Sequence, residues 1–162
     1  MTSSKKISPT FKDLTLRNFH DLAEAAKETG NLREAEEFYR NTYMGKVKIF
    51  GKFHPDCLTA LHNLALVLEL QRKFDDSIET FLEALQSREK VLGKHHPAAS
   101  STAFCLADLY RKINRPDDAR AMFEYAYEGF VKTEGTQGKN TKLTRSRLKA
   151  LDATQTMTCA IL

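Results

Sequence analysis

The amino-acid sequence predicts an all-α fold, a right-handed α-solenoid of three helical hairpins and a capping helix. Two observations carry this prediction. A loop string, Gly51-Lys-Phe-His54-Pro55, returns 42 residues later as Gly93-Lys-His-His96-Pro97. The same offset relates leucines, small residues and aromatics on both sides of that string. Self-similarity at a fixed period is the signature of a repeat architecture, in which each unit buries its apolar face against its neighbours.

The matched positions predict two helices in each repeat, a first helix (A) and a second helix (B). Small residues at matched positions let two helix backbones approach closely, and the leucines and aromatics around them fill the remaining space. The related positions are Leu22-Ala23, Leu64-Ala65 and Leu106-Ala107; Ala35, Ser77 and Ala119; Tyr39, Phe81 and Phe123; and Thr42, Ala84 and Ala126.

Glycine and proline mark where the helices begin and end. Gly30 supplies a helix stop with positive φ, and Pro116 suits the first turn of a B helix. Pro55 and Pro97 cannot continue a preceding helix and suit the first turn of an A helix, with His54 and His96 as structural caps. The expected A helices cover 13–28, 56–71 and 98–112, the expected B helices cover 32–49, 75–91 and 117–132, and the repeats cover about 13–54, 55–96 and 97–138.

The register continues beyond the third repeat. Gly135 aligns with Gly51 and Gly93, but Arg145 occupies a position where a core residue should be apolar. The end of a solenoid needs one polar face, because nothing stacks on it. We therefore expect a degenerate capping helix over about 140–155, which completes a repeat domain over 13–155, between a basic N-terminal tail (1–12) and a C-terminal tail (156–162).

Composition is that of a single soluble domain. The 162 residues are 41% hydrophobic and 28% charged, and no apolar run approaches the roughly 18 residues that a membrane-spanning helix needs. Three cysteines form no disulfide framework, which favours a reducing, cytoplasmic setting. Residues 1–12 and 139–162 carry an excess of basic residues, which leaves the body between them acidic. An acidic body argues against a nucleic-acid partner.

The positional pattern is similar to that of tetratricopeptide repeats, although those have about 34 residues per repeat. The 42-residue form, with His62-Asn-Leu-Ala-Leu, Ser87-Arg-Glu-Lys-Val-Leu-Gly and His95-His-Pro, closely resembles the repeats of kinesin light chains and nephrocystin-like proteins. The resemblance covers about 13–133 and is strongest over 50–112. It implies an adaptor or scaffold that binds a protein or peptide, in a cytoskeletal or ciliary setting.

The A helices of such a solenoid line its inner surface. The candidate partner-binding residues, expected to be exposed there, are Arg17, His20, Asp21, Glu24, Thr59, His62, Asn63, Leu66, Leu70, Phe104, Asp108 and Arg111. The resemblance implies an extended peptide whose backbone contacts an asparagine just before the Leu-Ala pair. Asn63 matches that asparagine, whereas Asp21 and Cys105 replace it in the flanking repeats. The alternative is a solvated groove with no strong ligand.

Catalytic and metal-binding motifs are absent from the sequence, so we expect no enzyme and no cofactor. His20 and His62 share one repeat position, but neighbouring helices lie roughly 10 Å apart and no further ligands accompany these histidines, so we expect no metal site. The second hypothesis for function is a structural subunit of a larger assembly, held by its outer surfaces.

The last four residues, Cys159-Ala160-Ile161-Leu162, match the C-a-a-X prenylation pattern, in which a terminal leucine favours a geranylgeranyl group. Five basic residues between Lys139 and Lys149 could supply a second membrane signal. Chance or a truncated end would also give the last four residues, and the basic residues would also be explained as the polar face of the cap. We expect a cytoplasmic monomer, tethered to a membrane if Cys159 carries a lipid on a short extended segment, 153–158.

Overall fold

The computed structural model describes the backbone of residues 11–159 and the side chains of residues 18–153. Within that range the chain forms seven α-helices and no strand. The helices are α1 (Phe11–Glu28), α2 (Leu32–Phe50), α3 (Pro55–Leu70), α4 (Phe74–Leu92), α5 (Pro97–Lys112), α6 (Pro116–Glu134) and α7 (Lys139–Cys159).

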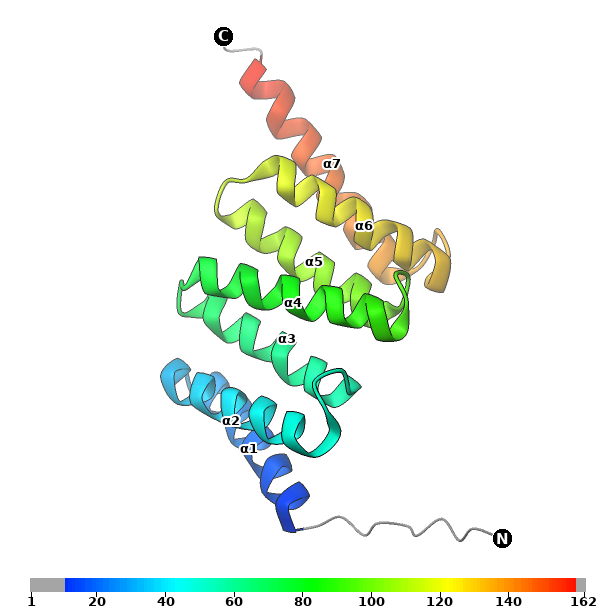
Figure 1. Ribbon diagram of the computed structural model, residues 1–162. Coiled ribbons are helices and arrows are strands. Elements are labelled where there is room, and N and C mark those ends of the chain that lie inside the picture. Colours follow the sequence, from blue (N-terminus) through cyan, green and yellow to red (C-terminus); the bar gives the residue numbers. More distant parts are fainter. Residues whose placement is uncertain (1–10, 160–162) are drawn as a thin grey trace, which may run out of the picture.

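Consecutive helices pair into hairpins that stack along one direction (Figure 1). The A helices α1, α3 and α5 form one layer with α7, and the B helices α2, α4 and α6 form the other. The turns that lead from A to B lie along one edge of the stack, and the loops that lead from B to A lie along the opposite edge. The predicted all-α solenoid is therefore confirmed.

The ends of the helices follow the predicted signals. The ring nitrogens Nδ1 of His54 and His96 accept hydrogen bonds from the backbone N–H groups of Asp56 (3.3 Å) and Ala98 (3.1 Å), so both histidines are N-caps. Gly30 ends α1 with a φ of 79°. Arg72 and Asn114 take the equivalent left-handed positions after α3 and α5, with φ of 63° and 60°, although neither is glycine.

Most helix ends lie within two residues of the expected ones, but two helices extend into the predicted tails. α1 begins at Phe11, inside the predicted N-terminal tail. α7 continues to Cys159 rather than ending near 155, because residues 150–159 contain no glycine or proline that would stop it. Residues 153–158 are consequently helical and not an extended tether. The rest of both predicted tails lies outside the described residues.

The core lies between the two layers and repeats with the sequence. Ala23, Ala65 and Ala107 are fully buried, as are the three aromatics Tyr39, Phe81 and Phe123. The Ser77 hydroxyl donates a 2.8 Å hydrogen bond to the carbonyl of Ala65, which joins α4 to α3 within the core. The small residues therefore act as predicted, by letting paired helices approach closely.

The two ends of the stack differ from its middle. Leu64 and Leu106 are buried by the preceding hairpin, whereas Leu22 is exposed because no hairpin precedes α1 within the described residues. On α7, Thr144 and Leu151 are buried, and α7 packs against α6. Lys149 is exposed at the position that Ala65 and Ala107 fill in the core. α7 therefore presents charge where α3 and α5 present alanine.

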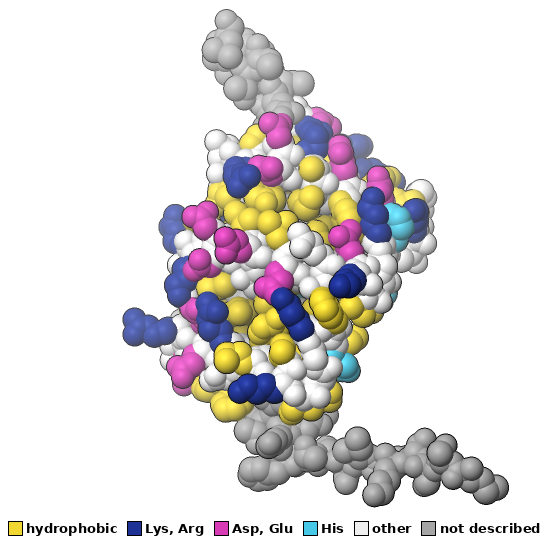
Figure 2. Space-filling model, viewed as in Figure 1, with side chains coloured by type: hydrophobic (Ala, Val, Ile, Leu, Met, Phe, Trp, Pro, Cys, Tyr) yellow, Lys and Arg dark blue, Asp and Glu magenta, His cyan; other side chains and the backbone are white. Residues whose placement is uncertain are grey.

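Figure 2 shows the face formed by the B helices, on which hydrophobic side chains gather in bands between charged ones. No helix within the described residues combines the length and the apolar character needed to cross a bilayer.

Candidate functional site

The predicted partner-binding residues all lie on the A helices, but they are not equally exposed. Asp21, Thr59, Leu70 and Arg111 are exposed. His20, Glu24, His62, Asn63, Leu66, Phe104 and Asp108 are partly buried. The side chain of Arg17 lies outside the described residues.

Three of the partly buried side chains pack against the core instead of lining an open groove. Their rings meet the core aromatics of the B helices edge-on at similar distances. The centroid distances are 5.9 Å for His20 and Tyr39, 5.5 Å for His62 and Phe81, and 5.4 Å for Phe104 and Phe123. These three positions, which were expected to be exposed, are therefore only partly exposed. Each ring packs edge-on against an aromatic core residue, which is a favourable arrangement for two aromatic rings.

The His62 ring is held in its neutral form by its surroundings. Burial and the nearby charge of Arg88 lower its pKa from 6.5 to about 4, so the imidazole is neutral in the folded protein at physiological pH. Its Nδ1 lies 3.4 Å from the hydroxyl oxygen of Thr102 on α5. The described residues contain no group of three or more His, Cys, Asp or Glu that could hold a metal ion.

Glu24 organises the inner surface where α1 meets α3. Its carboxylate accepts hydrogen bonds from the Tyr39 hydroxyl and the Lys27 ammonium. Burial by itself would raise the pKa of Glu24, but these bonds outweigh it and lower the pKa. The Nδ2 of Asn63 lies 3.5 Å from the same carboxylate. The asparagine that was expected to bind a peptide is thus oriented by a residue of the neighbouring hairpin.

Ion pairs continue this connection along the stack. The Lys112 ammonium lies 3.2 Å from the Glu69 carboxylate, which links α5 to α3. The Asp108 carboxylate lies 3.1 Å from Arg111 and 3.5 Å from Arg147, which links α5 to α7. These pairs are partly exposed, so each contributes modestly to stability, and together they set the charge pattern of the surface.

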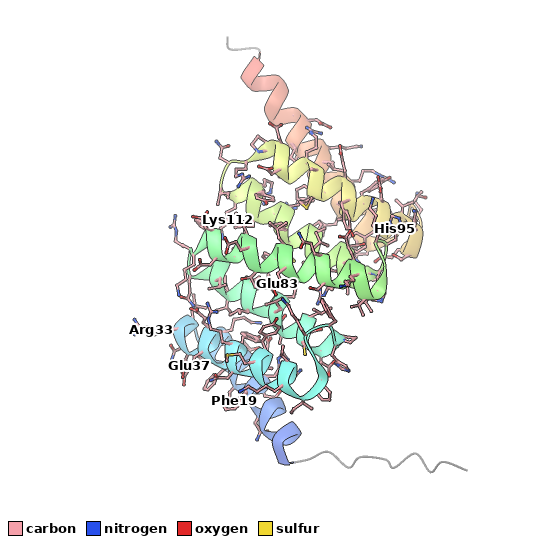
Figure 3. All side chains as sticks on the ribbon, in the orientation of Figure 1. Phe19, Arg33, Glu37, Glu83, His95 and Lys112 are labelled. Carbon is pink, nitrogen blue, oxygen red and sulfur yellow. The ribbon has the colours of Figure 1, made fainter. Side chains whose placement is uncertain are left out.

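An open hollow of about 600 Å³ lies where the inner surface meets the edge of A-to-B turns. Leu70 stands in it with 49% of its surface exposed, and the Arg72 guanidinium lies 5.9 Å from the centre of the Phe74 ring. Figure 3 shows Lys112 at this edge, on the opposite side of the stack from His95. The lining residues are Glu69, Leu70, Arg72, Phe74, Lys112, Ile113 and Asn114.

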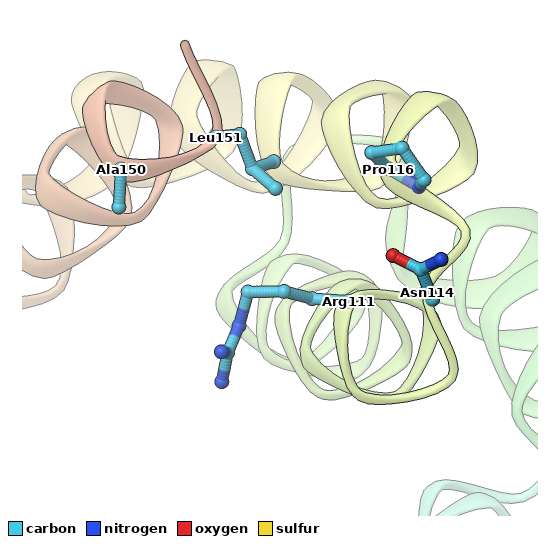
Figure 4. Close-up of a pocket in the computed structure, with 5 residues that line it drawn as sticks. All are labelled: Arg111, Asn114, Pro116, Ala150 and Leu151. Carbon is cyan, nitrogen blue, oxygen red and sulfur yellow. The ribbon is translucent and has the colours of Figure 1, made fainter. Parts of the chain in front are cut away.

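A second hollow, of about 300 Å³, adjoins the first through Asn114 and lies between the α5–α6 turn and α7 (Figure 4). It is lined by Arg111, Asn114, Pro116, Ala150 and Leu151. Only Leu70 and Arg111 of the predicted set line either hollow. The repeat pattern predicts where the turns from A to B helices lie. The residues with positive φ in the second and third turns, Arg72 and Asn114, are not glycines, so the sequence did not indicate the hollows that these turns border.

Comparison with known proteins gives a family for this fold. Two models of the tetratricopeptide repeat match the chain, over residues 15–56 and 56–130. No match was found among curated proteins.

Among solved structures, the chain is similar to the TPR-like repeats of a candidate kinesin light chain from Podosopora anserina and of a point variant of the same protein, each with a TM-score of 0.74 and 21% identity. These matches cover 85% of this chain and 65% of the other. The chain is also similar to BtubC (BKLC) from P. vanneervenii, with a TM-score of 0.68 and 19% identity over 94% of this chain and 69% of that one.

The chain thus spans about 65% of the length of the first of these structures. At this level of identity the structural likeness concerns the fold. The two matched models together run from residue 15 to residue 130, across all three hairpins. Because these models match its repeats, the chain belongs to the tetratricopeptide repeat family.

Proposed function

We propose that the chain is a non-enzymatic adaptor or scaffold that binds an extended segment of a partner protein along its A helices. Repeats of this family generally mediate contacts between proteins. The observation that carries the proposal is the position of Leu70, an exposed leucine in an open hollow at the border of the inner surface. An isolated exposed leucine is common, but one in a concave site with aromatic and aliphatic neighbours is a candidate ligand contact.

The chemistry around Leu70 suggests what the ligand presents. Phe74 and Ile113 provide apolar walls, and the Glu69–Lys112 pair provides one charge of each sign beside them. A ligand with one large apolar side chain would fill the hollow, and its backbone would run along α3 toward Asn63. Both signs of charge at the rim favour a polar peptide backbone over a strongly charged ligand.

The experiment is a capture of partners from a eukaryotic lysate, followed by direct calorimetry with the purified partner. Leu70→Ser should weaken binding, because it removes the apolar contact in the hollow. Met44→Ser is the matched control, since Met44 is as exposed but lies on the B-helix layer. Equal affinities for wild type and Leu70→Ser would place the partner elsewhere and sink the proposal.

The alternative proposal is a structural subunit held by its outer surface. Met44, 56% exposed, favours it, because this residue borders a hollow of about 240 Å³ on the side of the B helices. The lining residues are Arg40, Tyr43, Met44, Leu61, Leu64, Thr80 and Glu83. In the same experiment this alternative reverses the result: Met44→Ser loses the partner and Leu70→Ser retains it.

We also propose that Cys159 is prenylated when Leu162 is the C-terminal residue of the protein. The Cys159-Ala-Ile-Leu pattern supports this, and Cys159 is the last residue of α7. A lipid there would attach at the end of a helix and not on an extended tether, so the domain would stand close to the bilayer. The basic residues of α7 near its start lie several turns away from that attachment point.

A further inference from the structure

Four large hydrophobic side chains are exposed together at the B-to-A edge of the first two hairpins. They are Ile49 (42% exposed), Phe50 (40%), Phe53 (45%) and Val91 (41%). Ile49 and Phe50 end α2, Phe53 lies in the following loop, and Val91 is in the last turn of α4. Figure 1 shows that these two helix ends and the loop between α2 and α3 lie on the same edge of the stack.

The fold does not require apolar side chains at these positions. The third hairpin provides the comparison, because Thr133, Glu134 and Gln137 occupy the positions that Ile49, Phe50 and Phe53 occupy in the first. All three of these polar residues are exposed, and the third hairpin has the same helix lengths as the second. The apolar character of the edge is therefore an additional property of the first two hairpins.

Lysines surround these side chains and hold some of them in place. The Lys90 ammonium lies 4.6 Å from the centre of the Phe53 ring, and Lys52 forms a 2.8 Å ion pair with Glu83. The Phe50 ring stacks on the ring of His54 at 4.7 Å. These contacts fix the aromatic rings at the surface, so no large rearrangement is needed to present them to a partner.

The end of α2 and the loop that follows it are basic, and the acidic Glu83 nearby is paired with Lys52. Residues 44–53 contain Lys46, Lys48 and Lys52 and no acidic residue. The opposite edge differs, because the first turns of α2, α4 and α6 carry acidic residues. Figure 2 shows Lys or Arg, His and hydrophobic side chains, together with some Asp or Glu, along the edge where the B-to-A loops lie. We call the group formed by Ile49, Phe50, Phe53, Val91, Lys48 and Lys90 the basic apolar edge.

We propose that the basic apolar edge binds the surface of an anionic lipid bilayer. Aromatic and aliphatic side chains enter the interfacial region of a bilayer, while neighbouring lysines contact its anionic headgroups. The edge has both kinds of residue side by side. This inference is independent of the proposed lipid on Cys159, which lies at the far end of the stack (Figure 1).

Two other occupants fit the observations less well. A peptide would need a concave site, but the hollows described above are lined by other residues. A second copy of the chain, paired about a two-fold axis, would bring lysine against lysine across a symmetric contact. A bilayer is broad, anionic and needs no groove. Binding through this edge also leaves the A helices and the Leu70 hollow open to a partner.

The test uses the full chain made in bacteria, which add no prenyl group, and vesicles of phosphatidylcholine with or without phosphatidylserine. We expect binding only when phosphatidylserine is present, and weaker binding as salt is raised. Phe53→Ser should weaken vesicle binding by about tenfold, by removing one inserted ring. Lys48→Glu should weaken it by about twenty-fivefold, because reversal removes one attraction worth about fivefold and adds a repulsion of similar size.

Matched controls lie at the opposite edge. Leu70→Ser removes a comparably exposed hydrophobic side chain, and Arg33→Glu reverses a charge at the other end of α2. Both should leave vesicle binding unchanged, and circular dichroism checks that every variant is folded. The proposal is overturned if wild type ignores phosphatidylserine, or if the controls weaken binding as much as the edge variants. A dimer in sedimentation that Phe53→Ser dissociates, without vesicle binding, would instead assign the edge to protein association.

Discussion

The imidazole ring of His62 lies edge-on against the ring of Phe81 with the centroids 5.5 Å apart, and Phe104 meets Phe123 in the same way at 5.4 Å. The two contacts are one repeat apart, so a histidine and a phenylalanine serve the same packing role in successive hairpins. Only the histidine can take up a proton, and its surroundings oppose that. Burial and the charge of Arg88 lower the pKa of His62 to about 4.

The first prediction is that His62 makes the fold sensitive to mild acid. The unfolded chain binds the proton near pH 6.5 and the folded chain only near 4. The stability that neutral His62 contributes is therefore fully present above pH 6.5 and is lost as the pH falls toward 4. This loss lowers the free energy of unfolding by up to about 3 kcal/mol. His62→Phe, which copies the next hairpin, should flatten this part of the pH profile in urea denaturation. The same decline in both chains would contradict the assignment.

The second prediction concerns the close approach of α3 and α4. Ala65 is fully buried, and its carbonyl accepts the Ser77 hydroxyl. Ala65→Leu should overpack this contact and lower the free energy of unfolding by about 1–3 kcal/mol, measured by the denaturant midpoint. Ala25→Leu, on the exposed side of α1, is the control and should change it by less than about 0.5 kcal/mol. An unchanged midpoint for Ala65→Leu would mean that the helices do not meet there.

The third prediction concerns a buried cation. Arg88 of α4 donates hydrogen bonds to the carbonyls of Ala98 (2.9 Å) and Leu58 (3.4 Å), and to the Thr102 hydroxyl. One guanidinium thus joins three helices, and burial lowers its pKa. Lysine has no planar fork and cannot reach all three acceptors, so Arg88→Lys should destabilise the fold by about 1.5–3 kcal/mol.

Arg33→Lys tests whether the effect belongs to the buried position. Arg33 is exposed on α2, and the same change there should leave thermal and chemical unfolding essentially as in the wild type. If Arg88→Lys and Arg33→Lys have the same free energy of unfolding, then the three hydrogen bonds of Arg88 make no net contribution to stability.

The fourth prediction concerns recognition of a partner by α3. If an extended peptide binds there, the Asn63 side chain should hydrogen-bond its backbone while Glu24 holds the amide in place. Asn63→Ala should weaken binding by about 1–2 kcal/mol in calorimetry. Asn41→Ala, an exposed asparagine on α2, is the control. A partner with equal affinity for all three chains binds away from Asn63.

The fifth prediction concerns Cys159. A prenyl group contributes about 0.8 kcal/mol per buried CH₂ to membrane binding, so protein from eukaryotic cells should distribute to membranes. Cys159→Ser should move part of it to the supernatant and leave on membranes only what the basic apolar edge binds. Intact-mass spectrometry identifies the modification directly. An unmodified chain that ends at Leu162 would remove the lipid from the account and leave the basic apolar edge to be tested alone.

The order and pairing of the helices followed from the sequence. The Leu-Ala pairs, the core aromatics and the His-Pro loops recur at a constant offset, because every hairpin must bury the same face in the same way. Histidine caps were also predictable, since His54 and His96 each precede a proline that can only begin a helix. The end of α7 was predicted too early, because the departure from the repeat pattern in the capping helix concerns packing and not helix formation.

The sequence by itself therefore determined the repeat, the two helices of each unit and the residues of the core. Only the tertiary structure decided which side chains on the A helices remain available to a ligand. Whether His62 is buried or Asn63 is oriented by Glu24 depends on how neighbouring hairpins are rotated against each other. The Leu70 hollow and the basic apolar edge likewise combine residues from different hairpins. The repeat gives the spacing of matched residues along the sequence, but it does not give the distance between neighbouring hairpins in space.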